Sequence, residues 1–320
     1  MSASVPPPSA APVHRAGLAG KRFLVVTGKG GVGKTTVCAA EALALAHKGK
    51  RVLVAMCNAK ERLSTYLGSQ LVGHEVVSVA PNVWAVNMEP EAALEEYGML
   101  TLHSRALYKL LFDNKYVRTF FRAVPGMQEW AMLGKAWWHT TELREDGTPK
   151  YDVVILDAPA TGHGLDMLRV PKVILDVVPA GILRRDAERA WHMFQDPDTC
   201  AVVLVTLPEE MPTTETIELA RAIRDELKLP IGKVVVNQVL PPLFSREERA
   251  VLEGEERAKD GSAAEVAIGV ARSRAVRERV QAESLHRLAE ELPISPSYLP
   301  LLFDDAGRPE AIQELAKRLA

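Results

Sequence analysis

The chain has 320 residues, of which 47% are hydrophobic and 25% are charged, and its formal net charge is -2. This length can bury a sizeable core in one large domain or two, and the composition is that of an ordinary globular protein. The small net charge gives no electrostatic reason to expect a nucleic-acid partner. The three cysteines, Cys38, Cys57 and Cys200, lie singly without a C-x-x-C pair. They indicate a reducing compartment and argue against a disulfide framework or a zinc site.

The first twenty residues are rich in proline, alanine and serine. They lack the charged start and apolar run of a signal peptide, so we expect a disordered tail over residues 1–20. The longest apolar candidate, residues 173–183, is interrupted by Asp176 and Pro179 and is shorter than the roughly 18 residues of a membrane span. These features predict a cytoplasmic protein whose folded domain covers residues 21–320.

A glycine-rich loop between a buried strand and a helix is the most informative feature of the sequence. The apolar run 22–27 predicts the strand, and the alanine- and leucine-rich run 35–48 predicts the helix. Between them lies the loop G-K-G-G-V-G-K-T-T, residues 28–36. Glycines let consecutive backbone N–H groups point at one phosphate, and the start of the helix adds a positive end. This context predicts a nucleotide site that holds ATP and Mg²⁺.

The loop residues have distinct expected roles. Lys34 should reach the β- and γ-phosphates, and the Thr35 hydroxyl should ligate Mg²⁺. The alternative is a glycine-rich turn without a ligand. The residues expected to line the nucleotide here are Gly30, Gly31, Val32, Gly33, Lys34, Thr35 and Thr36.

Buried strands that alternate with helices predict a doubly wound α/β fold with a mostly parallel sheet. Helical segments are expected at 213–227, 247–292 and 310–320. The last one is expected to dock on the sheet through its apolar face, with a membrane-binding face as the alternative. A helical insertion at about 91–143 interrupts the alternation, and its aromatic residues favour core packing, with a partner-binding surface as the alternative. The further strands are expected at 51–56, 83–86, 153–156, 201–206, 233–236 and 294–299.

Asp157 directly follows the apolar run 153–156, at the position where a second magnesium-directed group, after Thr35, belongs. The alternative for Asp157 is a helix-capping or turn residue. His163, six residues later, is either a switch residue or an exposed loop histidine.

The loop with its second lysine, Lys29, resembles the deviant phosphate loop of the arsenite-pump and tail-anchored-protein targeting ATPases. The stretch 157–165, D-A-P-A-T-G-H-G-L, is similar to the D-T-A-P-T-G-H-T-L switch loop of that branch, with departures at 158–160 and 164. The resemblance implies that Lys29 crosses a dimer interface to the partner's nucleotide, as an arginine finger does. A solvated loop lysine is the alternative.

Two further motifs carry the resemblance into the second half of the chain. The stretch 234–238, V-V-V-N-Q, implies that Asn237 reads the adenine edge, with a strand-end turn residue as the alternative. The stretch 298–302, which includes Pro300, is similar to the late loop that packs over the base.

The sequence departs from this family where the first switch carries an aspartate that orients or activates the attacking water. Asn58 falls at that position, and asparagine cannot accept a proton, although it can hold a water. We therefore expect ATP binding with slow hydrolysis; Glu61 could replace the aspartate only if the loop changes shape. The cysteines match neither the metalloid ligands nor the zinc-binding pair of the family.

The resemblance implies a homodimer, or a heterodimer with a paralogous ATPase, and an unknown protein client or membrane partner. Two functions follow: a weak ATPase that acts as a dimeric switch, or a hydrolysis-deficient regulatory subunit that pairs with an active paralogue. A metabolic kinase ranks last, because no acceptor site is evident.

Overall fold

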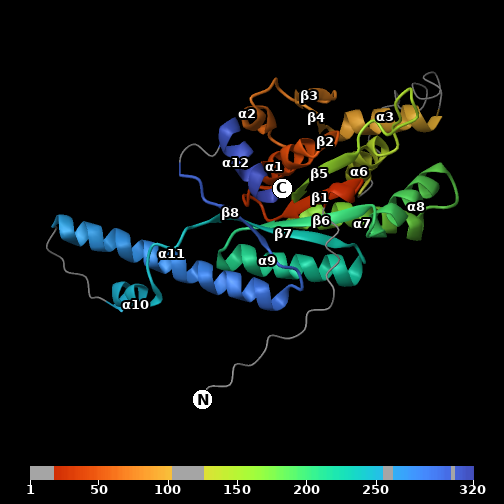
Figure 1. The fold of residues 1–320 in the computed structure, drawn as a ribbon. Coiled ribbons are helices and arrows are strands. Elements are labelled where there is room, and N and C mark those ends of the chain that lie inside the picture. Colours follow the sequence, from red (N-terminus) through yellow and green to blue (C-terminus); the bar gives the residue numbers. More distant parts are fainter. Residues whose placement is uncertain (1–17, 103–125, 255–261, 304–306) are drawn as a thin grey trace, which may run out of the picture.

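A computed structural model of the chain describes residues 18–102, 126–254, 262–303 and 307–320. Its centre is an eight-stranded sheet in the order β3-β4-β2-β5-β1-β6-β7-β8 (Figure 1). All neighbouring strands are parallel except β3, which pairs antiparallel with β4. The strands are β1 (Phe23–Gly28), β2 (Val52–Cys57), β3 (Val77–Ala80), β4 (Val83–Met88), β5 (Val153–Ala160), β6 (Cys200–Thr206), β7 (Ile231–Val239) and β8 (Ser297–Pro300).

Helices cover both faces of the sheet, so the predicted doubly wound α/β fold is confirmed. One face is covered by α1 (Lys34–His47), α2 (Leu63–Leu67) and α12 (Pro309–Leu319). The remaining helices are α3 (Pro90–Leu102), α6 (Met127–His139), α7 (Thr161–Val177), α8 (Ile182–Gln195), α9 (Glu210–Arg221), α10 (Arg246–Gly254) and α11 (Ala263–Glu291).

Strand β1 shows how the sequence builds this layered core. Phe23 and Val25 point to the face covered by α6–α9, whereas Leu24 and Val26 point to the α1 face. All four are buried, as a central parallel strand requires, because helices lie on both sides of it. Each side chain of this size contributes about 1.5–3 kcal/mol when fully buried.

Several boundaries differ from the sequence prediction. The antiparallel edge strand β3 is not anticipated by the apolar pattern, and β5 continues through Ala160 instead of ending near Asp157. The helix expected at 213–227 begins earlier, as α9, and passes into a π-helical turn over Ala222–Glu226. The C-terminal helix α12 does dock on the body, since Ile312 and Leu315 are buried against the α1 side of the sheet.

The interval 91–143 contains α3 and α6 among its described residues. Trp130 of α6 is fully buried in the core, in keeping with core packing, while Trp137 and Trp138 are half-buried. Tyr108, Phe112, Phe120 and Phe121 lie outside the described residues. Of the described helices, none is both long enough and apolar enough to cross a bilayer.

Candidate functional site

The loop from Gly28 to Lys34 joins β1 to α1 at the carboxyl edge of the sheet. Two of its glycines are required because neighbouring atoms leave no room for a Cβ. A Cβ on Gly28 would lie 2.1 Å from the carbonyl oxygen of Val205, and one on Gly33 would lie 2.4 Å from Nδ2 of Asn237. Gly33 also has a φ of +90°, in the left-handed region that side chains disfavour. The loop can therefore keep this tight course only with glycine at both positions.

Lys34, the first residue of α1, folds back over the loop. Its Nζ donates hydrogen bonds to the carbonyl oxygens of Gly28 and Lys29, both at 3.1 Å. Burial lowers the pKa of Lys34, and the nearby Asp157 carboxylate opposes this shift. The ammonium group is thus held against the loop by two of its carbonyl oxygens, and a phosphate bound to the N–H groups of the same loop would offer it an anionic partner.

Thr35 and Asp157 come together from different elements. The Thr35 hydroxyl in the first turn of α1 donates to Oδ2 of Asp157 at 2.6 Å. Asp157 lies on β5 opposite Val26 of β1 and is 4% exposed, and this burial raises its pKa. A hydroxyl beside a buried carboxylate is the hard oxygen pair that Mg²⁺ prefers. These two residues therefore fit the magnesium role predicted for them.

Asn237 contacts the phosphate loop itself. Its Nδ2 donates to the carbonyl oxygen of Val32 at 3.0 Å, and its Oδ1 accepts from the backbone N–H of Gln238 at 3.0 Å. The side chain is buried and ties the end of β7 to the loop. One amide N–H remains for a base, so adenine reading by Asn237 stays a prediction. Pro300 pairs with Val239 at the same edge of the sheet.

Lys29 turns toward its own chain. Its Nζ forms an ion pair of 2.5 Å with Oε1 of Glu215 on α9, and both side chains are about one-third exposed. No pattern in the sequence assigns Glu215 a role. The pair spans 186 positions, so no local pattern could reveal it. The reach of Lys29 toward a partner's nucleotide stays a prediction.

Asn58 follows β2 and is exposed, with a φ of 45° that asparagine tolerates better than most residues. Its backbone N–H donates to the carbonyl oxygen of Met88. Glu61, the one possible substitute, accepts from the N–H and the hydroxyl of Ser64 at 2.8 and 2.6 Å. This carboxylate is hydrogen-bonded at the start of α2, which supports the expectation that Glu61 does not replace the missing aspartate in hydrolysis.

The stretch after Asp157 is more regular than a switch loop. Strand β5 runs through Ala160 and α7 begins at Thr161, so Gly162 and His163 lie in the first turn of a helix, where both are exposed. The choice between a switch residue and an exposed histidine stays open for His163.

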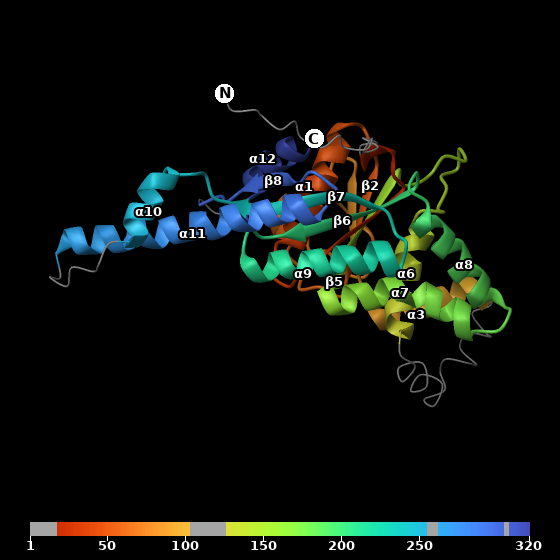
Figure 2. The ribbon, with the colours of Figure 1, turned by 90° about the horizontal axis from the view of Figure 1, so that it is seen from below.

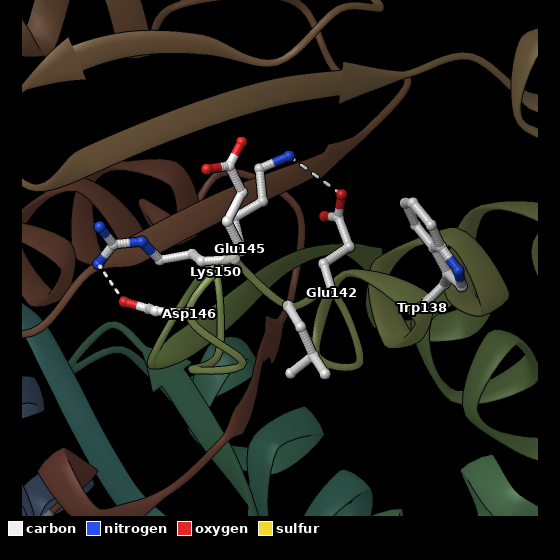
Figure 3. Close-up of a pocket in the computed structure, with 7 residues that line it drawn as sticks. Trp138, Glu142, Glu145, Asp146 and Lys150 are labelled. Carbon is white, nitrogen blue, oxygen red and sulfur yellow. Dashed lines mark hydrogen bonds and ion pairs between the residues drawn. The ribbon is translucent and has the colours of Figure 1, made fainter.

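A hollow lies at the amino end of β5, on the opposite side of the sheet from the phosphate loop's edge (Figure 3). Its acidic side chains are partly neutralised by ion pairs, such as Lys150 with Glu142 at 3.0 Å. No group of three or more metal-ligating side chains is found in the described part of the chain. The hollow is lined by Trp138, Glu142, Leu143, Arg144, Glu145, Asp146 and Lys150.

Comparison with known proteins identifies the family. The model of a family described as anion-transporting ATPase matches residues 21–183 and 182–257. The chain belongs to this family. Its matched region includes the phosphate loop, Asn58, Asp157 and Asn237.

Individual members of the anion-transporting ATPase family are similar over most of the chain. ATPase BagA of Mycobacterium tuberculosis is 30% identical over 244 residues, which cover 74% of this chain and 71% of that protein. A Halobacterium salinarum protein named as a candidate arsenical pump-driving ATPase is 32% identical over 69% of this chain and 36% of its own length. ATPase GET3B of Arabidopsis thaliana is 24% identical over 70% of this chain and 66% of its own length.

Proposed function

We propose that this chain is an ATP-binding switch that works as a dimer and hydrolyses ATP slowly. The observation that carries the proposal is the convergence of Lys34, Thr35 and Asp157 on one loop of backbone amides. Lys34 and the loop N–H groups would hold the phosphates, while Thr35 and Asp157 would hold Mg²⁺. The metal would neutralise charge on the phosphates.

The dimer part of the proposal concerns Lys29. Its ion pair with Glu215 would have to open before the ammonium group could cross to a partner's nucleotide. When two chains close around ATP in the cytoplasm, Lys29 would then exchange the carboxylate of Glu215 for the phosphates of the partner's nucleotide. A rearrangement of this kind could be transmitted through α9 to a client-binding surface.

Slow hydrolysis rests on Asn58. An amide can orient a water through hydrogen bonds but cannot remove its proton, and a general base typically contributes about 10²–10⁴ in rate. The same observation favours a second function, a regulatory subunit that binds ATP and depends on an active paralogue for turnover.

The test is steady-state phosphate release at saturating magnesium from wild type, Asn58→Asp and Lys34→Ala. Aspartate tolerates the positive φ at position 58, so the substitution changes the chemistry with little backbone strain. We expect wild type to release phosphate slowly but faster than Lys34→Ala. Asn58→Asp should be at least about tenfold faster than wild type, because a general base typically contributes about 10²–10⁴ in rate.

Equal rates for wild type and Lys34→Ala would contradict the proposal that the chain hydrolyses ATP. An Asn58→Asp variant no faster than wild type would show that position 58 does not limit the rate. A mixture with a paralogous chain that exceeds the sum of the separate rates would favour the regulatory subunit.

A further inference from the structure

The segment that carries Asn58 leaves the sheet close to the phosphate loop. Strand β2 ends at Cys57 and lies beside α1, the helix that follows the loop (Figures 1 and 2). Within the sheet, Met56 of β2 is paired with Asp157 of β5. Asn58 is therefore two residues beyond a position level with the proposed magnesium carboxylate, at the same edge of the sheet.

Backbone pairing with β4 continues past the end of β2. The register of these two parallel strands ends with Cys57 opposite Met88. One residue later, the backbone N–H of Asn58 donates to the carbonyl oxygen of Met88 at 2.9 Å. This bond holds the backbone of Asn58 on β4, although the residue has already left the strand.

The side chain of Asn87 on β4 makes the next attachment. Its Oδ1 accepts from the backbone N–H of Ala59 at 3.1 Å, and its Nδ2 donates to the carbonyl oxygen of the same residue at 2.9 Å. One amide group thus binds both polar groups of a single backbone residue. The two bonds to Ala59 and the bond from Asn58 to Met88 together form a clamp, which we name the β4 clamp.

The β4 clamp fixes a backbone conformation that most residues disfavour. Asn58 has a φ of 45°, in the left-handed region that costs residues with a side chain about 1–2 kcal/mol, although asparagine adopts it more readily. Hydrogen bonds at its own N–H and at Ala59 hold this conformation from both sides. The Asn58 side chain itself is exposed and has no hydrogen bond to any residue that the structure describes. The side chain is therefore available to a water while its backbone is fixed.

We infer that Asn87 is a positioning residue for ATP hydrolysis, because through Ala59 it sets where the Asn58 side chain lies relative to the bound phosphates. The inference rests on the proposed function, in which Asn58 holds the attacking water. Asn87 acts only through the backbone of its neighbour, so it is not itself a catalytic residue. A group that is displaced by about 1 Å from its productive position can cost about 10²-fold in rate.

This role separates the rate of hydrolysis from the affinity for ATP. The proposed ligands of phosphate and magnesium lie on α1 and β5, whereas the β4 clamp joins the end of β2 to β4. Loss of Asn87 should therefore lower kcat and leave KM for ATP nearly unchanged. The free energy of unfolding should fall by only about 1 kcal/mol, because the freed groups of Ala59 are half-buried and can bind water instead.

The test measures steady-state phosphate release over a range of ATP concentrations for wild type, Asn87→Ala and Asn87→Leu. Leucine is similar in size to asparagine but makes no hydrogen bond, so it separates the bonds from the packing. The matched control is Ser78→Ala, which shortens an exposed polar side chain on β3, the strand beside β4. We expect kcat to fall at least about tenfold in both Asn87 variants, with KM within about twofold of wild type, and we expect the control to match wild type.

Two further measurements connect the rate to the clamp. In the Asn58→Asp background, Asn87→Ala should remove most of the gain of about tenfold or more that aspartate provides. Amide hydrogen exchange needs no turnover: the Ala59 amide should exchange at least about tenfold faster in both Asn87 variants, because its acceptor is gone. The amides of the phosphate loop should exchange as they do in wild type.

Asn87 variants whose kcat matches wild type, alone and with Asn58→Asp, would overturn the inference. So would an unchanged exchange rate at Ala59, or a loss of affinity for ATP as large as the loss of kcat, which would indicate general damage to the site. The failure of the proposed function gives a different result. In that case neither wild type nor Asn58→Asp releases phosphate, whichever residue stands at position 87, and the inference falls with it.

Discussion

Asn237 shows how one amide can serve the fold and the site together. It is buried at the end of β7, and its Nδ2 holds the carbonyl oxygen of Val32 in the phosphate loop at 3.0 Å. The same Nδ2 occupies the space that a Cβ on Gly33 would need. The loop conformation therefore depends on a residue 205 positions away in the sequence.

Asn237→Ala should destabilise the protein by about 1–3 kcal/mol, because the Val32 carbonyl loses its donor in a buried setting. ATP binding should weaken as well, since the loop is no longer held. Chemical unfolding with urea measures the first effect. Gln238→Ala is the matched control, since it shares the strand end but is exposed, and it should change stability by less than about 0.5 kcal/mol. An Asn237→Ala protein as stable as wild type would show that the bond contributes nothing.

At the scale of elements, the amino ends of β2 and β5 are joined by one ion pair. Asp152 Oδ2 accepts from the backbone N–H of Arg51 at 2.8 Å and from its Nε at 3.1 Å, while Oδ1 accepts from Nη2 at 2.9 Å. These hydrogen bonds from Arg51 lower the pKa of Asp152. The pair fixes the register in which β2 meets β5, far from the phosphate loop.

Asp152→Asn should therefore cost about 1 kcal/mol at neutral pH, as expected for a partly exposed charge-assisted pair. Because the folded-state pKa lies below the unfolded value of about 3.9, the stabilisation is full above that value and is lost as the pH falls through the folded pKa. Urea unfolding from pH 7 downward should show the two proteins converging in acid. Asp225→Asn, at an exposed pair with Arg224, is the control; Arg224 also lowers the pKa of Asp225, but solvent screens this pair, so the substitution should change stability much less than Asp152→Asn at every pH. A constant difference across this range would contradict the assigned cause.

The sequence patterns predict the positions of helices and strands better than they predict the contacts between these elements. Seven strands and the phosphate loop follow from apolar runs and glycine spacing, since these signals are local. The edge strand β3 is only four residues long and partly exposed, so it carries little apolar pattern. The pairing of Lys29 with Glu215 and the bond from Asn237 to Val32 join distant segments, which only the folded chain brings together.

At the scale of the whole molecule, the described side chains of the site bind other groups of the same chain. Lys34 binds carbonyl oxygens of its own loop, Lys29 binds Glu215, and Thr35 binds Asp157. A triphosphate with magnesium would offer new partners to all of these groups. The proposed binding of ATP would therefore exchange these internal bonds for bonds to phosphate and metal.

Isothermal titration calorimetry of ATP into the folded protein with magnesium tests this central claim most directly. We predict saturable binding by wild type and its loss in Lys34→Ala. Lys29→Ala should retain binding within the single chain, because its proposed role lies across the dimer. Absence of heat from pure, folded wild-type protein with either ATP or ADP, or equal binding by Lys34→Ala, would contradict the account.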